Sequence, residues 1–279
     1  MQRLYDLSAP AKLNLFLHIT GRRADGYHLL QSVFMLIDWC DTLHVEIRAD
    51  GLISREDLGA KLPADDLVLR AARALQLASG CGLGVHIGIE KRIPAEAGMG
   101  GGSSDAATTL LALNRLWQLN WPLDQLLPIG LALGADVPFF LGGHNAWVEG
   151  IGDIMTPITL PPAKFLVAKP ASGLPTHAIF SDPELKRDSD TAILSGFSAN
   201  PFGFGRNDLQ RVAQRLCPGV TQALDWLAAL GLSGRMTGSG SAVFAQLDRP
   251  LQVERAPVSL QTRVCSNLGV HPLAGWAPA

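Results

Sequence analysis

The sequence predicts an α+β protein built from two domains. Short runs in which every second residue is apolar alternate with longer runs whose apolar residues lie three or four positions apart. The first pattern is typical of half-buried strands and the second of amphipathic helices. The composition changes between positions 157 and 162, where three of the six residues are proline. We place the domain boundary there, which gives an N-terminal domain of residues 1–156 and a C-terminal domain of residues 157–279.

Composition and charge exclude several classes of protein. Hydrophobic residues make up 47% of the 279 residues and charged residues 17%, which is enough apolar material for a sizeable core. The net charge of −2 indicates no basic surface for nucleic acid. The most apolar window, residues 126–148, contains Asp136 and His144, so we expect no membrane partner. Scattered cysteines and the absence of a leader pattern favour a soluble, cytoplasmic protein.

The first hundred residues predict strands, a turn and one helix. The Asp25-Gly26 dipeptide marks a hairpin turn, and Asp65-Asp66 supplies a helix cap. Residues 49–64 are rich in Gly, Asp and Pro and are expected to form a loop. The expected strands cover residues 13–19, 32–37, 43–47 and 83–89, and the expected helix covers residues 67–77.

The remainder of the chain mixes short strands with helices. Pro138 biases its predecessor away from helix, so Asp136 is expected in a loop or extended turn shortly before it. Residues 252–264 are ambiguous, and the last fifteen residues are expected to be loop. Further strands are expected at residues 139–141, 146–149 and 164–168, helices at 106–117, 123–133, 209–216 and 220–230, and a glycine turn leading into a strand at 236–247.

A glycine-rich segment between a predicted strand and a predicted helix is the strongest functional signal. It runs from Pro94 to Asp105 and holds four glycines within five positions. Glycine lets the backbone turn where a Cβ would clash. Ser103, Ser104 and Asp105 are expected to cap the helix that follows. Free N–H groups and the helix dipole favour an anion at such a helix start, so the segment predicts a phosphate-binding loop.

The spacing excludes the familiar phosphate loops. A Walker A loop ends in Gly-Lys-Ser/Thr, and no lysine follows these glycines. Both the dinucleotide fingerprint and the protein-kinase glycine loop need glycine at position 103, where Ser103 stands. A purely structural glycine turn is the alternative, and it predicts no ATP binding.

Two charged residues are candidates for the chemistry of phosphoryl transfer. Asp136 lies in an apolar context, where an unpaired carboxylate is costly, and is the best candidate for a general base. Lys12 is the only charge between Leu7 and Leu17 on an early strand. Taken alone, each residue has an ordinary explanation: Asp136 as an aspartate in a turn, and Lys12 as a solvent-exposed lysine on an edge strand. A catalytic role for either residue therefore depends on the predicted phosphate-binding loop.

Five segments together resemble the GHMP kinase superfamily. They read P-A-K-L-N-L at 10–15, G-R-R-A-D-G-Y-H at 21–28, P-A-E-A-G-M-G-G-G-S-S-D-A-A at 94–107, G-A-D-V-P-F-F-L at 134–141 and T-G-S-G-S-A-V-F-A at 237–245. The resemblance covers most of the chain and implies the GHMP kinase fold. In that fold, an N-terminal domain like the second domain of ribosomal protein S5 meets a ferredoxin-like C-terminal domain at a cleft.

The resemblance also implies an activity. The segments at 21–28 and 135–140 are most similar to the branch that uses ATP to phosphorylate the 2-hydroxyl of a cytidine diphosphate-linked methylerythritol in the non-mevalonate isoprenoid route. Mg²⁺ is expected to arrive with ATP, and no metal ligand is assigned. The ATP-binding residues implied are Pro94, Ala95, Glu96, Ala97, Gly98, Met99, Gly100, Gly101, Gly102, Ser103 and Ser104.

Residue roles follow from the same resemblance. Asp136 is implied as catalytic base, with Lys12 beside it. An ammonium there keeps the base ionised and stabilises charge on the acceptor oxygen. The implied substrate-binding residues are Asn14, Tyr27 and His28 near the N-terminus, Thr176 and Phe180 in the second half, and Gly238 and Gly240 in the third motif. Tyr27 and His28 are implied at the cytosine end, and Phe180 as a second stacking aromatic.

Two departures from the family pattern and two alternatives remain. Met99 and Asp105 stand where leucine and asparagine are more usual. The first change conserves volume, and the second adds a negative charge near the polyphosphate. The alternatives are another GHMP small-molecule kinase, of homoserine or mevalonate type, and a nucleotide-binding regulatory protein without turnover. The sequence leaves open whether the chain is a monomer or a homodimer.

Overall fold

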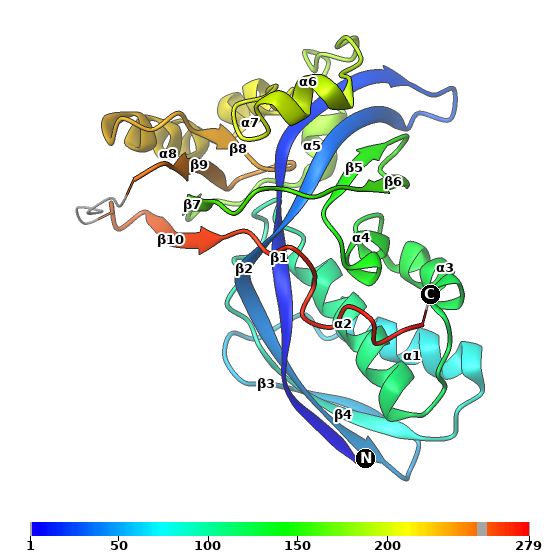
Figure 1. The fold of residues 1–279 in the computed structure, drawn as a ribbon. Coiled ribbons are helices and arrows are strands. Elements are labelled where there is room, and N and C mark those ends of the chain that lie inside the picture. The colour runs from blue at the N-terminus through cyan, green and yellow to red at the C-terminus, as the bar shows by residue number, and fades with distance from the viewer. Residues whose placement is uncertain (1, 250–255, 279) are drawn as a thin grey trace.

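The fold is organised around one long antiparallel hairpin. The computed structural model describes residues 2–249 and 256–278. Strands β1 (Arg3–Arg22) and β2 (His28–Arg48) pair along nearly their whole length. Figure 1 shows the two strands running through both halves of the molecule. The predicted strands at 32–37 and 43–47 are therefore parts of one strand, because residues 40–42 stay paired with β1 after a bulge at residues 38–39 and the chain does not turn.

Four shorter strands extend this hairpin into a six-stranded sheet. Part of β2 pairs with β4 (Gly84–Glu90), and another part pairs with β5 (Ala146–Glu149). β3 (Ile53–Asp57) lies parallel to β4, and β6 (Ile154–Pro157) forms the other edge. The expectation of a loop over 49–64 is wrong at β3, because pairing with β4 overrides the Gly- and Asp-rich local sequence.

Four helices cover one face of the six-stranded sheet. They are α1 (Leu67–Ser79), α2 (Gly101–Leu116), α3 (Leu123–Leu133) and α4 (Val137–Gly142). α1 begins where predicted, with the Asp66 carboxylate accepting from the Leu69 N–H at 3.1 Å. The strand expected at 139–141 is wrong: α4 forms there, because a proline is tolerated in the first turn of a helix, where its missing N–H has no partner to lose.

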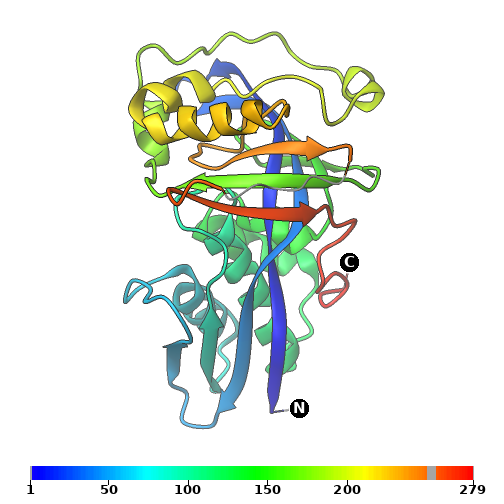
Figure 2. The same ribbon diagram turned by 90° about the vertical axis from the view of Figure 1, so that its left-hand side faces the viewer.

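A second sheet packs against the other face of the hairpin. It contains β7 (Lys164–Pro170), β8 (Arg235–Met236), β9 (Val243–Leu247) and β10 (Leu260–Ser266) in the order β10-β7-β9-β8. Its inner face joins the hairpin in one core, with Phe165 and Phe244 beside Leu13 and Met35. Its outer face lies under α7 (Gln210–Leu216) and α8 (Pro218–Ala229). Figure 2 shows its strands running across the hairpin.

The connection from β7 to α7 carries two short helices, α5 (Thr176–Phe180) and α6 (Leu194–Ala199). Within the part of the chain that the structure describes, no helix is long and apolar enough to cross a bilayer. The ambiguous region 252–264 contains the start of β10, and its first residues, 252–255, lie outside the described residues.

The α+β prediction is confirmed. The boundary at residue 157 stays a prediction, although the last strand of the first sheet ends there. The C-terminal segment returns to the first layer: Leu273 is buried in its core, and the Pro278 carbonyl accepts from the Leu123 N–H at 2.9 Å.

Candidate active site

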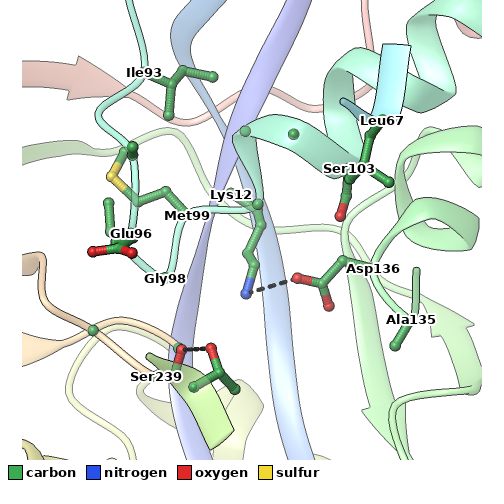
Figure 3. A pocket seen from close by; sticks show the side chains of 18 of the residues that line it. Lys12, Leu67, Ile93, Glu96, Gly98, Met99, Ser103, Ala135, Asp136 and Ser239 are labelled. Carbon is green, nitrogen blue, oxygen red and sulfur yellow. Dashed lines mark hydrogen bonds and ion pairs between the residues drawn. The ribbon is translucent and has the colours of Figure 1, made fainter. Parts of the chain in front are cut away.

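A cavity of about 860 Å³ lies where the hairpin, the glycine loop and the second sheet meet. Segments far apart in the sequence line it, and Figure 3 shows several of their side chains from close by. The lining residues that the sequence predicted are Lys12, Asn14, residues 94–103, Asp136, Thr176, Phe180, Gly238 and Gly240. Three predicted residues, Ser104, Tyr27 and His28, do not line it.

The glycine loop is shaped by left-handed backbone positions and by a second glycine turn packed on it. Glu96, Gly98 and Gly100 have φ values of 50°, 70° and 71°. A Cβ on Gly98 would lie 2.4 Å from the Thr237 carbonyl oxygen, and one on Gly238 would lie 2.6 Å from the Gly98 carbonyl oxygen. The two glycine segments thus approach more closely than any other residue type allows.

Main-chain hydrogen bonds hold the two segments in register. The Ser241 N–H donates to the Glu96 carbonyl at 3.1 Å, and the Ala242 N–H donates to the Ala97 carbonyl at 3.2 Å. The Lys12 N–H donates to the Met99 carbonyl at 2.9 Å, which ties the loop to β1 as well. The loop is therefore a rigid cradle supported from two sides.

Helix α2 begins directly after the loop and points its first turn at the cavity. Its N-cap is Gly100, at φ 71°, and no side chain caps it. The prediction that Ser103, Ser104 and Asp105 cap the helix is wrong, because all three lie inside it. The first N–H groups of a helix have no partner within the helix, so they are available to an anion. Ser103 lines the cavity beside them, whereas Ser104 is fully buried.

Lys12 and Asp136 face one another across the cavity from that helix start (Figure 3). The Lys12 Nζ lies 3.6 Å from Asp136 Oδ2, and the exposed fractions of the two side chains are 5% and 33%. Asp136 is held at the start of α4. The buried ammonium also donates to the Asn14 Oδ1 and lies 4.6 Å from the centroid of the Phe34 ring. A carboxylate open to the cavity and paired with a buried cation is suited to accept a proton.

Asn14 is fixed by three contacts. Its amide accepts from Lys12 and donates to the Ser32 Oγ at 2.9 Å. Its main-chain N–H donates to the Thr237 Oγ1 at 2.8 Å, so β1 is joined to the third glycine motif at this point.

A buried charged cluster behind the loop was not foreseen. The Lys91 ammonium donates to Asp41 and to the Asp105 Oδ2, the second at 2.6 Å. Asp105 is 2% exposed, and its other oxygen has no partner among the described residues. Burial raises the pKa of Asp105 to about 8, against the lowering effect of Lys91, and Asp41 raises it further. Burial alone would lower the pKa of Lys91, but Asp105 and Asp41 raise it.

This cluster explains how an aspartate is accommodated at position 105, where the family pattern more often has asparagine. A Cβ built on Gly101 would lie 3.4 Å from the Lys91 Nζ, so the ammonium lies directly under the first turn of α2. Asp105 therefore pairs with this cation, and both residues contribute to the cavity wall beneath the loop. Burial raises the pKa of this carboxyl, and the raised pKa disfavours a negative charge next to a bound polyphosphate.

The far end of the cavity is made by side chains of the second half. The hydroxyls of Thr176 and Ser239 lie 2.7 Å apart, and the Phe180 ring centroid lies 5.2 Å from that of His28. His28 does not line the cavity itself, but its ring packs against Phe180, which does. Tyr27 is 61% exposed at the tip of the hairpin turn, away from the cavity lining.

Sequence reasoning missed several residues at the site. Ser239 lies inside a quoted motif and could have been named, because it stands between two assigned glycines. The others had no sequence signal: they are Phe34 and Asp41 of β2, Lys91 after β4 and Arg187 after α5.

Comparisons with known proteins agree with this geometry. Family models for the GHMP kinase N-terminal and C-terminal domains match residues 66–144 and 194–265. A 4-diphosphocytidyl-2-C-methyl-D-erythritol kinase of Albidiferax ferrireducens is 74% identical over 277 residues, covering 99% of this chain and 96% of the relative. The enzyme of the same name from Variovorax paradoxus is 65% identical, covering 99% of this chain and 100% of the relative.

Solved structures of kinases also match this chain. A crystal structure of 4-(cytidine 5'-diphospho)-2C-methyl-D-erythritol kinase superposes with a TM-score of 0.82 at 35% identity, covering 94% of this chain and 98% of the other. A homoserine kinase from Cytophaga hutchinsonii matches with a TM-score of 0.70 at 14% identity, covering 97% and 96% of the two chains, which shows the fold alone. The chain belongs to the GHMP kinases, and within them to the 4-diphosphocytidyl-2-C-methyl-D-erythritol kinase family.

Proposed function

We propose that this chain transfers the γ-phosphoryl group of ATP to the 2-hydroxyl of 4-diphosphocytidyl-2-C-methyl-D-erythritol, giving the 2-phosphate and ADP. The reaction belongs to the non-mevalonate route to isoprenoid precursors. The observation that carries the proposal is the Lys12–Asp136 pair, 3.6 Å apart, facing the open start of α2 in one cavity. The relatives that bear this name support the choice of substrate.

The glycine loop and the start of α2 form the ATP end. Residues 95–102 offer main-chain N–H groups, and α2 adds its dipole, both of which stabilise the phosphate oxygens. Ser103 adds a hydroxyl to this end. Ser104 is buried, so we assign it to the packing of α2 and not to a direct phosphate contact.

Asp136 acts as the general base. Its carboxylate accepts the proton of the 2-hydroxyl as the oxygen attacks the γ-phosphorus, and the bond from that phosphorus to the ADP oxygen breaks. Lys12 orients the carboxylate and stabilises negative charge on the attacking oxygen. Catalysis in this class depends mainly on positioning and charge stabilisation, which a rigid cradle supplies.

A magnesium ion fits this site without a dedicated carboxylate cluster. Groups of three or more metal-ligating side chains do not occur in residues 2–249 and 256–278. Mg²⁺ that arrives with ATP keeps several waters and needs only one or two protein oxygens. The Ser103 hydroxyl, on the cavity wall at the start of α2, is the protein oxygen that suits this role. When bound, the ion neutralises charge on the phosphate oxygens.

The substrate end is formed by the hairpin turn and α5. We assign the cytosine ring to Phe180 and His28, whose rings lie side by side, and the remainder of the substrate to Thr176, Asn14, Gly238 and Gly240, which line the path toward Asp136. Tyr27 is assigned to the outer edge of this end, where an exposed aromatic ring can cover a bound base. We also infer that the reaction takes place in the cytoplasm, where ATP is supplied.

A substrate panel tests the proposal. The purified chain, with Mg²⁺ and ATP, is offered 4-diphosphocytidyl-2-C-methyl-D-erythritol, homoserine and mevalonate, and ADP release is followed. We expect turnover with the cytidylyl substrate and none with the other two. Turnover of homoserine or mevalonate alone would overturn the choice of substrate, and ATP binding without turnover of any acceptor would indicate a regulatory protein.

A further inference from the structure

One nitrogen of the His28 ring is held by an arginine that the proposed reaction does not use. The Arg187 Nε–H donates to the His28 Nε2 at 3.0 Å. The rest of this guanidinium is anchored to main-chain carbonyls: it donates to Leu185 at 3.0 Å, to Phe180 at 3.2 Å and to Asp182 at 2.7 Å. Arg187 is therefore clamped to the chain around the end of α5, and its Nε is aimed at the histidine.

The chemistry of the two groups fixes the direction of this hydrogen bond. A guanidinium has only donors, so the His28 Nε2 must accept. In a neutral imidazole the nitrogen that accepts carries no proton, and the proton is on the other nitrogen. The opposite tautomer would place two N–H groups against each other. His28 therefore carries its proton on Nδ1, which donates to no other described residue.

The same contact opposes protonation of the ring. A second proton would have to enter at Nε2, where the Arg187 N–H already lies. The charges that bear on His28 in the described part of the chain are those of Arg187 and Arg22, and both are positive. Burial lowers the pKa of His28, and these two arginines lower it further. The Phe180 ring, packed at 5.2 Å, adds no charge.

We propose that Arg187 is a positioning residue for substrate recognition: it fixes His28 as a neutral ring whose Nδ1 offers a hydrogen-bond donor to the pyrimidine of the substrate. This inference rests on the proposed function. A donor at this place suits an acceptor on the base. The N3 atom of cytosine accepts, whereas the N3–H of uracil donates, so the fixed tautomer favours a cytidylyl over a uridylyl substrate.

Arg187 also couples the two walls of the base site. Its guanidinium donates to the Phe180 carbonyl as well as to His28, so one side chain sets the position of the aromatic wall and of the donor. His28 and Phe180 come from different halves of the chain, β2 and α5. Among the described residues, Arg187 is the only side chain whose hydrogen bonds join His28 to Phe180.

The first test needs no variant and no substrate. Nitrogen-15 NMR of the histidine-labelled parent chain, without ligand at pH 6.5, reports which ring nitrogen of His28 carries the proton. We expect a neutral ring protonated at Nδ1. A ring protonated at Nε2, or a charged ring at this pH, would overturn the inference. Because this measurement does not depend on turnover, its outcome is separate from that of the substrate panel.

The second test compares two arginines. In Arg187→Met we expect the His28 tautomers to mix, the pKa of His28 to rise, and KM for the cytidylyl substrate to rise about tenfold, the size of one lost hydrogen bond, with a smaller change in kcat. The matched control is Arg22→Gln, which removes a nearby charge but no contact to Nε2, so the tautomer stays as in the parent. An Arg187→Met chain that folds and keeps both the parent tautomer and the parent KM would contradict the inference.

Discussion

The two ends of the cavity are built in different ways. The proposed ATP end consists of main chain: glycines at φ 70° and 71°, cross-loop N–H to carbonyl bonds and the start of α2. The proposed substrate end consists mainly of side chains, with His28, Phe180 and Arg187 brought together from β2, α5 and the segment after it. A main-chain site depends on glycine and little else in the side chains, whereas a side-chain site depends on contacts between distant segments.

The largest effect is expected between the two ends, at Asp136. Asp136→Asn keeps the shape of the residue but removes the proton acceptor, so we expect kcat to fall by about 10²–10⁴-fold with KM for both substrates little changed. Steady-state kinetics measure this, with Asp124→Asn on the exposed first turn of α3 as the control. A kcat within a few-fold of the parent would show that another group takes the proton.

A strong effect is also expected at the ATP end from a single methyl group. Gly98→Ala places a Cβ 2.4 Å from the Thr237 carbonyl at a φ of +70°, so the loop must shift away from the third motif. We expect a large loss of ATP affinity by calorimetry, together with a lower Tm. Gly59→Ala is the control, because a Cβ there meets nothing within 4 Å. Unchanged ATP affinity in Gly98→Ala would contradict the main-chain account of this end.

A smaller effect is expected under the loop, at Asp105. Burial raises the pKa of Asp105 in the folded chain to about 8, so the folded state holds this proton more tightly than the unfolded state does. The stabilising contribution is complete below the unfolded pKa of about 3.9 and is lost as the pH rises toward 8. Asp105→Asn does not titrate.

The Tm of Asp105→Asn minus the Tm of the parent should therefore increase from pH 5 to pH 9. Thermal unfolding measures this difference. Asp65→Asn, an exposed partner of Arg73, is the control and should give a nearly constant difference. A difference for Asp105→Asn that is constant or falls over this range would mean that the carboxyl is ionised throughout.

The same contrast explains what the sequence could predict. The strand, glycine loop and helix of the proposed ATP end were predictable because they are contiguous and follow one another in residues 84–116. The early strand carrying Lys12 and Asn14 was predictable from its alternation, and the structure brings both side chains to Asp136 and the third motif. Their catalytic roles remain proposals.

The rest could not be predicted because it depends on tertiary contacts. Lys91 directly follows β4, and only the fold places it between Asp41 of β2 and Asp105 of α2. Arg187 lies in a polar stretch without periodicity, and its partner His28 is 159 positions away. The helix at 137–142 was missed because Pro138 was interpreted as a breaker and not as a residue of the first helical turn.

The most direct test of the two-ended cavity is one set of four KM values. Ser103→Ala changes the ATP end and Phe180→Ala changes the substrate end, and KM for ATP and for the cytidylyl substrate is measured in each variant. We expect Ser103→Ala to raise KM for ATP alone, and Phe180→Ala to raise KM for the cytidylyl substrate alone by about tenfold or more, as loss of base stacking implies. Variants that each raise both KM values equally would contradict the division of the cavity into an ATP end and a cytidine end.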